Sequence, residues 1–115
     1  MKKLKNYKLI NKIDEFILIR CKKAINKIDP FAKLVLYGSR ARGNATSESD
    51  YDLLILTDNP ASLEREDIFR REIYPIELET GAVLTVILVN KKDWDSQVYN
   101  AMPFHQNVEK DGIIL

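Results

Sequence analysis

Two short stretches of the sequence carry residue types that could bind a charged ligand. The first is Gly38-Ser39, which directly follows an apolar run over residues 34–37. Glycine lets the backbone approach a ligand closely. The unpaired N–H groups at a new helix start, together with the serine hydroxyl, favour an anion such as phosphate. Arg40 and Arg42 could add positive charge beside it, although their spacing does not require both to face the ligand.

The second stretch supplies two carboxylates. Asp50 and Asp52 are separated by one residue at the start of a predicted strand. Because side chains alternate faces along a strand, both should point to one side with Cα atoms about 7 Å apart, while Tyr51 points to the other. Such oxygens suit Mg²⁺, which combines a few carboxylates with phosphate oxygens of a substrate. Two such ions, roughly 4 Å apart, could assist an in-line displacement at phosphorus.

Each stretch alone also has an ordinary structural explanation. Gly38-Ser39 could be a strand-to-helix turn with a serine cap, and Asp50 and Asp52 could be solvated acids at a loop-to-strand boundary. The joint pattern is more specific, because the pieces come in order and on the elements that their chemistry requires. The sequence contains neither G-x-x-x-x-G-K-[ST] nor G-x-G-x-x-G, which excludes two other common phosphate-binding motifs.

The apolar pattern predicts the elements that position these residues. Apolar residues at helical spacing predict a first helix that ends at Asp29-Pro30, because a residue before proline is pushed out of the helical region. Pro75 should kink or divide a later, longer helix. In chain order, the predicted elements are a helix over about 10–28, a strand over 34–37, one or two helical turns over 39–42, a strand over 51–57, a helix over about 62–80, a strand over 82–89, and short helices within 91–100 and 103–110.

This alternation predicts an α/β (α+β) fold in which helices pack against a small mixed or parallel sheet. The apolar tail 113–115 could pair as an edge strand or dock on a partner. His105 has no second histidine or cysteine at ligand spacing, so we expect it to pack rather than to bind metal. We expect Trp94 to fill the core beside the third predicted strand.

Length and composition predict one domain over residues 1–115, without repeats or linkers. Hydrophobic residues make up 45% of the chain and charged residues 30%, as in globular proteins. No stretch approaches the 18 apolar residues of a membrane span, and we expect no membrane association and no secretory signal. Cys21 is the only cysteine, so an internal disulfide is excluded and a cytoplasmic setting is predicted.

Charge is distributed unevenly along the chain. Residues 1–28 contain nine lysines and arginines against Asp14 and Glu15, a net charge of +7, whereas the remainder carries a net charge of −6. A basic helix can indicate a nucleic-acid partner. No aromatic residues are interleaved as stacking platforms, so a solvated lysine face is favoured and nucleic acid is not expected as a ligand.

The motif Gly38–Gly43, followed by Ser49–Leu53, resembles the signature of the DNA polymerase beta-like nucleotidyltransferase superfamily. The branch that it resembles most is that of the minimal nucleotidyltransferases, small prokaryotic proteins of about this length. The resemblance covers essentially the whole chain. It implies the nucleotidyltransferase fold, with Gly38 and Ser39 binding a nucleoside triphosphate and with Asp50 and Asp52 ligating Mg²⁺. It further implies transfer of a nucleoside monophosphate, AMP from ATP, to a protein or small-molecule hydroxyl, with release of pyrophosphate.

The third predicted strand departs from the family pattern. Active members usually carry a third carboxylate on this strand, whereas residues 81–90 contain no acid and Thr85 is the predicted equivalent position. A threonine hydroxyl substitutes poorly for a carboxylate as a metal ligand or a general base. The alternative is therefore a catalytically weak or inactive nucleotide-binding module. The resemblance implies that such a module would act as an antitoxin that binds an all-helical HEPN-type partner. A homo-oligomer also remains open.

Overall fold

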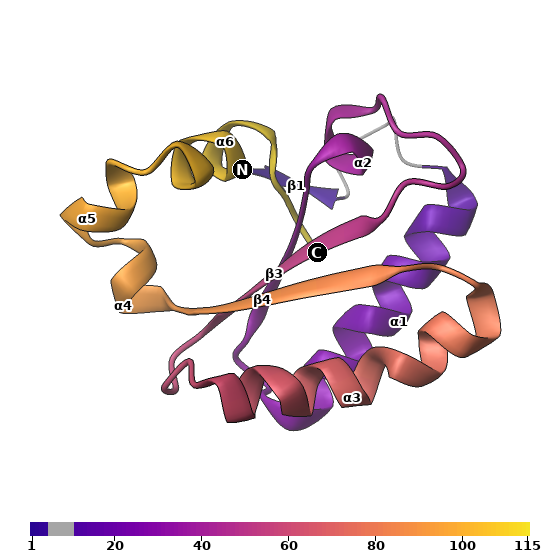
Figure 1. Ribbon diagram of the computed structural model, residues 1–115, viewed down its shortest axis with the longest axis horizontal. Coiled ribbons are helices and arrows are strands. Elements are labelled where there is room, and N and C mark those ends of the chain that lie inside the picture. Colours follow the sequence, from indigo (N-terminus) through magenta and orange to yellow (C-terminus); the bar gives the residue numbers. More distant parts are fainter. Residues whose placement is uncertain (5–10) are drawn as a thin grey trace.

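The computed structural model describes residues 1–4 and 11–115, which build one mixed five-stranded sheet with helices against it (Figure 1). The strand order is β1-β5-β2-β3-β4. Strand β2 runs antiparallel to both β3 and β5, whereas β3 and β4 are parallel, as are β1 and β5. The predicted mixed sheet is thus confirmed. The strands are β1 (Lys2–Lys3), β2 (Lys33–Tyr37), β3 (Tyr51–Thr57), β4 (Leu84–Asn90) and β5 (Ile113–Ile114).

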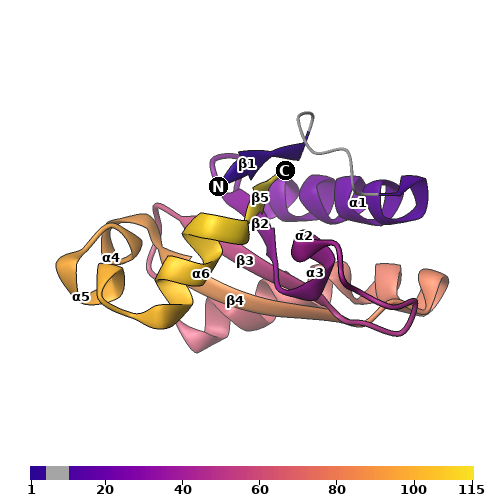
Figure 2. The same ribbon diagram turned by 90° about the horizontal axis from the view of Figure 1, so that it is seen from above.

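The helices divide between the two faces of the sheet. Helices α1 and α3 cover one face over the larger apolar core, and α4 to α6 cover part of the other face over a smaller one. Figure 2 shows α4, α5 and α6 gathered at the side away from α1. The helices are α1 (Lys12–Ile28), α2 (Ser39–Arg42), α3 (Leu63–Thr80), α4 (Lys91–Trp94), α5 (Gln97–Asn100) and α6 (Pro103–Asp111).

Local signals account for the ends of the two long helices. Asn11 caps α1 by accepting a hydrogen bond from the Asp14 N–H at 2.8 Å, and α1 ends before Pro30 as predicted. Helix α3 ends at Gly81, whose positive φ of 74° allows a left-handed C-cap. Pro75 was expected to kink or divide this helix; the division is wrong, because α3 runs uninterrupted through it. Pro75 lies on the exposed face, where water can bond the carbonyl that proline leaves unpaired.

The C-terminal half differs from its prediction in two places. The tail does not form an edge strand: β5 lies between β1 and β2, with Ile113 opposite Leu36 and fully buried. The stretch 91–100 forms two short helices, because Ser96 caps α5 by accepting from the Tyr99 N–H at 3.3 Å. His105 and Trp94 pack as expected: both are buried, and their rings lie 4.3 Å apart.

Side chains of α3 close the outer edge of β4. The backbone N–H of Leu84 donates to the carboxylate of Glu77 at 3.0 Å, and that of Leu88 donates to Glu66 at 3.1 Å. An open strand edge would otherwise present unpaired donors to another chain. The edge that carries β4 is therefore capped from within the molecule.

Two further features limit what the core and helices can do. Cys21 is fully buried, and burial raises the pKa of its thiol to about 12, so it stays protonated and unreactive. Among the described residues, no helix combines the length and apolarity needed to cross a membrane.

Candidate active site

The turn between β2 and α2 requires glycine. Gly38 has a positive φ of 78°, a conformation that residues with a Cβ rarely adopt. A Cβ at this position would also overlap Oδ2 of Asp52. The turn and the carboxylate are therefore in direct contact, and no residue larger than glycine fits between them.

Asp52 lies between this turn and the next strand. Within the sheet it stands opposite Tyr37 on β2 and opposite Thr85 on β4. The hydroxyl of Thr85 donates a hydrogen bond to Asp52 Oδ1 at 2.8 Å. One carboxylate oxygen thus accepts from Thr85 while the other lies against Gly38, which fixes the orientation of the side chain.

Asp50 is placed one residue before β3 and is exposed to solvent. No hydrogen bond or ion pair reaches its carboxylate from the described residues. Tyr51, between the two acids, is buried on the opposite face of the sheet, where its hydroxyl contacts Asp14. That Asp50 shares a face with Asp52 stays a prediction from strand alternation, because Asp50 itself lies just outside β3.

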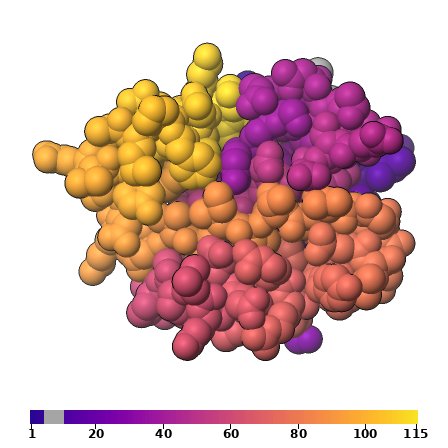
Figure 3. Space-filling view, viewed as in Figure 1, coloured from indigo at the N-terminus to yellow at the C-terminus, as the bar shows by residue number. Residues whose placement is uncertain are grey.

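The Ser39 hydroxyl and the Arg42 guanidinium have no partner among the residues that the structure describes. Arg42 and Gly38 line one wall of a cavity of about 220 Å³. Its other wall belongs to α6, which contributes Asn107 and Asp111. In Figure 3 the segment around α2 (purple) and the segment of α6 (yellow) adjoin on the face in view. Arg42 thus remains available to an anion that enters this cavity.

The guanidinium of Arg40, which was also predicted to lie beside the phosphate, is engaged by groups of the protein itself. Its guanidinium pairs with Asp14 on α1 at 3.1 Å and donates to the backbone oxygen of Ser49 at 2.7 Å. It also stacks over the Tyr51 ring at 3.9 Å. The buried Asp14 carboxylate is the physical reason, because it needs a cationic partner and Arg40 is within reach.

Tyr37 is a site residue that sequence reasoning missed. Its side chain is half-buried, shares a face with Asp52, and packs edge-on against Phe104 with ring centroids 5.3 Å apart. Burial first, and the Asp52 charge second, raise the pKa of Tyr37 to about 12. The phenol therefore stays neutral beside the cavity. Its position directly before Gly38 was the one available signal.

Comparison with known proteins agrees with this geometry. Residues 18–113 match the family described as the nucleotidyltransferase domain. This chain belongs to that family. Two proteins of Methanocaldococcus jannaschii, both named as putative protein adenylyltransferases, are similar to it. The first is 29% identical over 97 residues, which is 83% of this chain and 65% of the relative. The second is 31% identical over 83 residues, which is 72% of this chain and 76% of the relative. The chain thus spans just under two thirds of the first relative's length.

The site has few carboxylates that could bind a metal ion. Within the described ranges, no three His, Cys, Asp or Glu side chains gather as a metal site. Thr85 stands directly opposite Asp52 on β4, where the family pattern leads us to expect a third carboxylate. Its hydroxyl is already used as a donor to Asp52. Asp50 and Asp52 alone could hold a divalent cation only if substrate oxygens complete its coordination, which is the way Mg²⁺ is commonly bound.

Proposed function

We propose that this domain is a metal-dependent nucleotidyltransferase that moves AMP from ATP to a hydroxyl of a protein or small molecule. The observation that carries the proposal is the contact between Asp52 and Gly38. This contact brings the acid at the start of β3 against the glycine-serine turn, in which the Ser39 hydroxyl has no partner among the described residues. The names of the two similar proteins support adenylyl transfer to a protein.

The two acids fit a hard divalent cation. Asp50 is exposed and has no internal donor among the described residues, and Asp52 uses one oxygen for Thr85. Both therefore keep oxygen lone pairs for a ligand, as Mg²⁺ requires. When bound, Mg²⁺ would neutralise charge on the phosphate oxygens as the displacement proceeds. Because the described residues contain no group of three metal-binding side chains, one ion rather than two is the better supported number.

The triphosphate would lie across the turn at Gly38. With its α-phosphate at the two aspartates, it would pass over Gly38 into the cavity that Arg42 lines. Ser39 and Arg42 would bind the phosphates that leave as pyrophosphate. The acceptor oxygen then forms its bond to the α-phosphorus as the bond from that phosphorus to the bridging oxygen of pyrophosphate breaks. The acceptor proton passes to water, because Thr85 offers no basic group.

Thr85 favours a second candidate function. A nucleotidyltransferase domain without its third acid could bind ATP with little turnover, since an acid–base group contributes about 10²- to 10⁴-fold to rate. Such a domain would act as an antitoxin by covering an all-helical HEPN-type partner. Nucleotide binding would then stabilise the complex rather than supply a reactant.

One experiment separates the two candidates. The protein is incubated with Mg²⁺, ATP labelled at the α-phosphate, and an all-helical HEPN-type protein. Label on the partner supports the transferase, and a stable complex without label supports the binding module. Asp67→Asn on the exposed side of α3 is the matched control and should behave like the unaltered protein. If neither label nor complex is found, both functions are wrong for this pair.

A further inference from the structure

Arg40 donates hydrogen bonds to the backbone of the loop that leads to Asp50. Arg40 belongs to α2, yet its Nε donates to the Ser49 oxygen at 3.0 Å and its Nη2 donates to the same oxygen at 2.7 Å. Nη2 also lies 3.3 Å from the Ser47 oxygen. Ser49 directly precedes Asp50. Because a planar guanidinium aims both donors in a fixed fork, it determines where the chain enters β3.

The guanidinium is itself held from the other side. Its Nη1 lies 3.1 Å from Asp14 Oδ1, and the two side chains are only 8% and 12% exposed. The Tyr51 hydroxyl donates to the same Asp14 oxygen at 2.5 Å. Helix α1 thus anchors both Arg40 and Tyr51 through one carboxylate.

The contacts fall on both sides of Asp50 in the chain. The Ser49 carbonyl is gripped before it, and the Tyr51 ring is covered by the guanidinium at 3.9 Å after it. Neither contact involves the Asp50 carboxylate, which stays exposed. A carboxylate on a short loop would otherwise lose freedom when it binds a cation, and fixing the flanking backbone removes that cost in advance.

We propose that Arg40, Asp14 and Tyr51 form a clamp that positions Asp50 as a metal ligand, with Arg40 acting as a positioning residue rather than as a phosphate ligand. This inference rests on the proposed function, because it requires Asp50 to have a cation to bind. Residues that orient a ligand from behind commonly change metal affinity by about 10- to 100-fold when they are altered.

The test compares Mg²⁺ dependence in variants of the clamp. Arg40→Lys keeps the charge but cannot aim two donors at Ser49 and stack at the same time. Tyr51→Phe removes only the hydroxyl. Calorimetric titration with ATP at several Mg²⁺ concentrations should show a half-saturating Mg²⁺ concentration that is about tenfold higher in Arg40→Lys. The increase should be smaller in Tyr51→Phe. The matched control Arg71→Lys, on exposed α3, should leave it unchanged.

Two titration results would overturn the clamp. The first is an unchanged Mg²⁺ requirement in both Arg40→Lys and Tyr51→Phe. The second is a loss of ATP affinity that is confined to Arg40→Lys and persists at saturating Mg²⁺, because this is the behaviour of a direct phosphate ligand. A loss shared with Tyr51→Phe and relieved by added Mg²⁺ supports the clamp, since Tyr51 faces away from the site.

A second measurement needs no nucleotide. Amide hydrogen exchange over residues 43–50 should be faster in Arg40→Lys than in the unaltered protein, with unchanged exchange in the core strands. If the unaltered protein binds no Mg²⁺–ATP, the proposed function fails together with the metal-positioning role, and exchange then reports only whether Arg40 holds the loop. Unchanged exchange over this loop would show that Arg40 does not hold it.

Discussion

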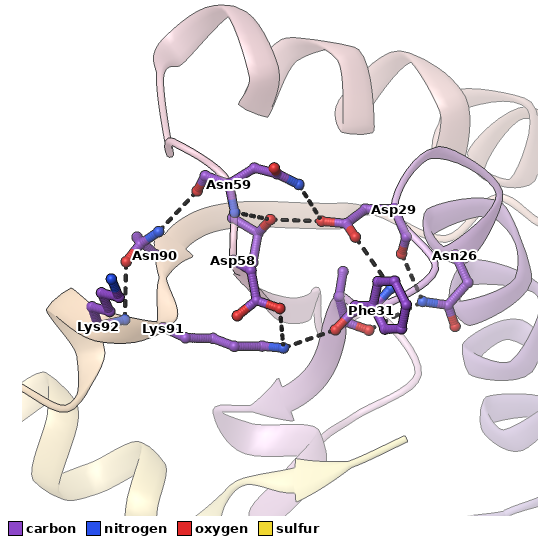
Figure 4. A network of polar contacts seen from close by, with 10 residues as sticks. Asn26, Asp29, Phe31, Asp58, Asn59, Asn90, Lys91 and Lys92 are labelled. Atoms are coloured by element: carbon purple, nitrogen blue, oxygen red, sulfur yellow. Dashed lines mark hydrogen bonds and ion pairs between the residues drawn. The ribbon is translucent and has the colours of Figure 1, made fainter.

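Polar residues gather at both ends of the central strands, but the two ends use them differently. At one end lie Asp50 and Asp52, which receive one hydrogen bond between them from the described residues, that of Thr85. At the other end lies a network around Asp29, drawn in Figure 4. The same type of side chain is thus left open at one end and fully engaged at the other.

The network around Asp29 at the closed end supplies three hydrogen bonds to its carboxylate. Asp29 is 5% exposed and accepts from the Thr57 hydroxyl at 2.6 Å, from Asn59 Nδ2 at 3.3 Å and from the Phe31 N–H at 3.1 Å. Lys91 ties the same region together through the Phe31 oxygen at 2.9 Å. With three donors supplied from within the protein, Asp29 joins the end of α1 to the end of β3 and has little capacity left for a ligand.

The number of hydrogen-bond donors that the protein itself supplies, rather than the residue type, therefore separates a structural acid from a candidate ligand. A carboxylate offers about four lone-pair sites. Asp29 fills most of them from its own chain, whereas Asp50 fills none from the described residues. The two ends should therefore respond in opposite ways to removal of their acids.

The largest expected effect is on binding at the open end. Asp50→Ala combined with Asp52→Ala should abolish Mg²⁺-dependent ATP binding, a loss of at least about 100-fold, because the part of the chain that the structure describes contains no other group of acids that could hold the cation. The free energy of unfolding should change by less than about 1 kcal/mol, because few contacts are lost. Calorimetry and urea unfolding measure the two quantities. Binding that survives intact would mean that these acids are not ligands.

Adding an acid to the open end should sharpen the contrast. Thr85→Asp places a carboxylate opposite Asp52, where the family pattern has one, and should increase any basal transfer by up to about 10²-fold. Incorporation of label from ATP into an acceptor measures the rate. Thr85→Asn has similar size without the charge and serves as the control. Equal rates in the two variants would indicate that the site lacks more than this one group.

At the closed end, the expected effect is on stability. Asp29→Asn replaces one acceptor oxygen by an NH₂ group that faces either the Thr57 and Asn59 donors at Oδ2 or the Phe31 N–H at Oδ1, so we expect a loss of about 2 kcal/mol in the free energy of unfolding. ATP binding in the folded variant should be unchanged. Asp58→Asn, at an exposed ion pair in the same network, should cost about 0.5 kcal/mol or less. A binding defect in Asp29→Asn would break the division between the two ends.

Sequence reasoning reached the parts of the molecule that depend on neighbouring residues. The strand over 51–57 and the helical turn over 39–42 were predicted with the bounds that the structure has. An apolar run defines the strand locally, and the glycines on either side define the helical turn. Thr85 was chosen as the position of the missing acid because it is the only polar residue inside its strand. The structure pairs it with Asp52. Tyr51 faces away from the acids, as the alternation along a strand requires.

Contacts between residues that are far apart in the chain could not be predicted from the sequence. Asp14 and Arg40 are 26 positions apart and Asp14 and Tyr51 are 37 apart, and no local pattern indicates that α1 delivers a carboxylate behind the loop. Arg40 was therefore assigned to the ligand from its neighbours alone. The tail was expected at an edge because it is short, whereas its position between β1 and β2 depends on how the whole sheet assembles.

The smallest expected effect is the pH dependence of the closed end. Burial alone would raise the pKa of Asp29, but the hydrogen bonds from Thr57, Phe31 and Asn59 outweigh it, so the pKa lies below the ordinary value of 3.8. A carboxyl with a lowered pKa in the folded state stabilises the protein above the unfolded pKa, and this contribution is lost as pH falls through the folded pKa. The stability difference between the unaltered protein and Asp29→Asn should therefore be constant from pH 5 to 7 and shrink below about pH 4. Urea midpoints across this range measure it. If this stability difference stays constant down to pH 2, the negative charge of Asp29 contributes nothing to the free energy of unfolding.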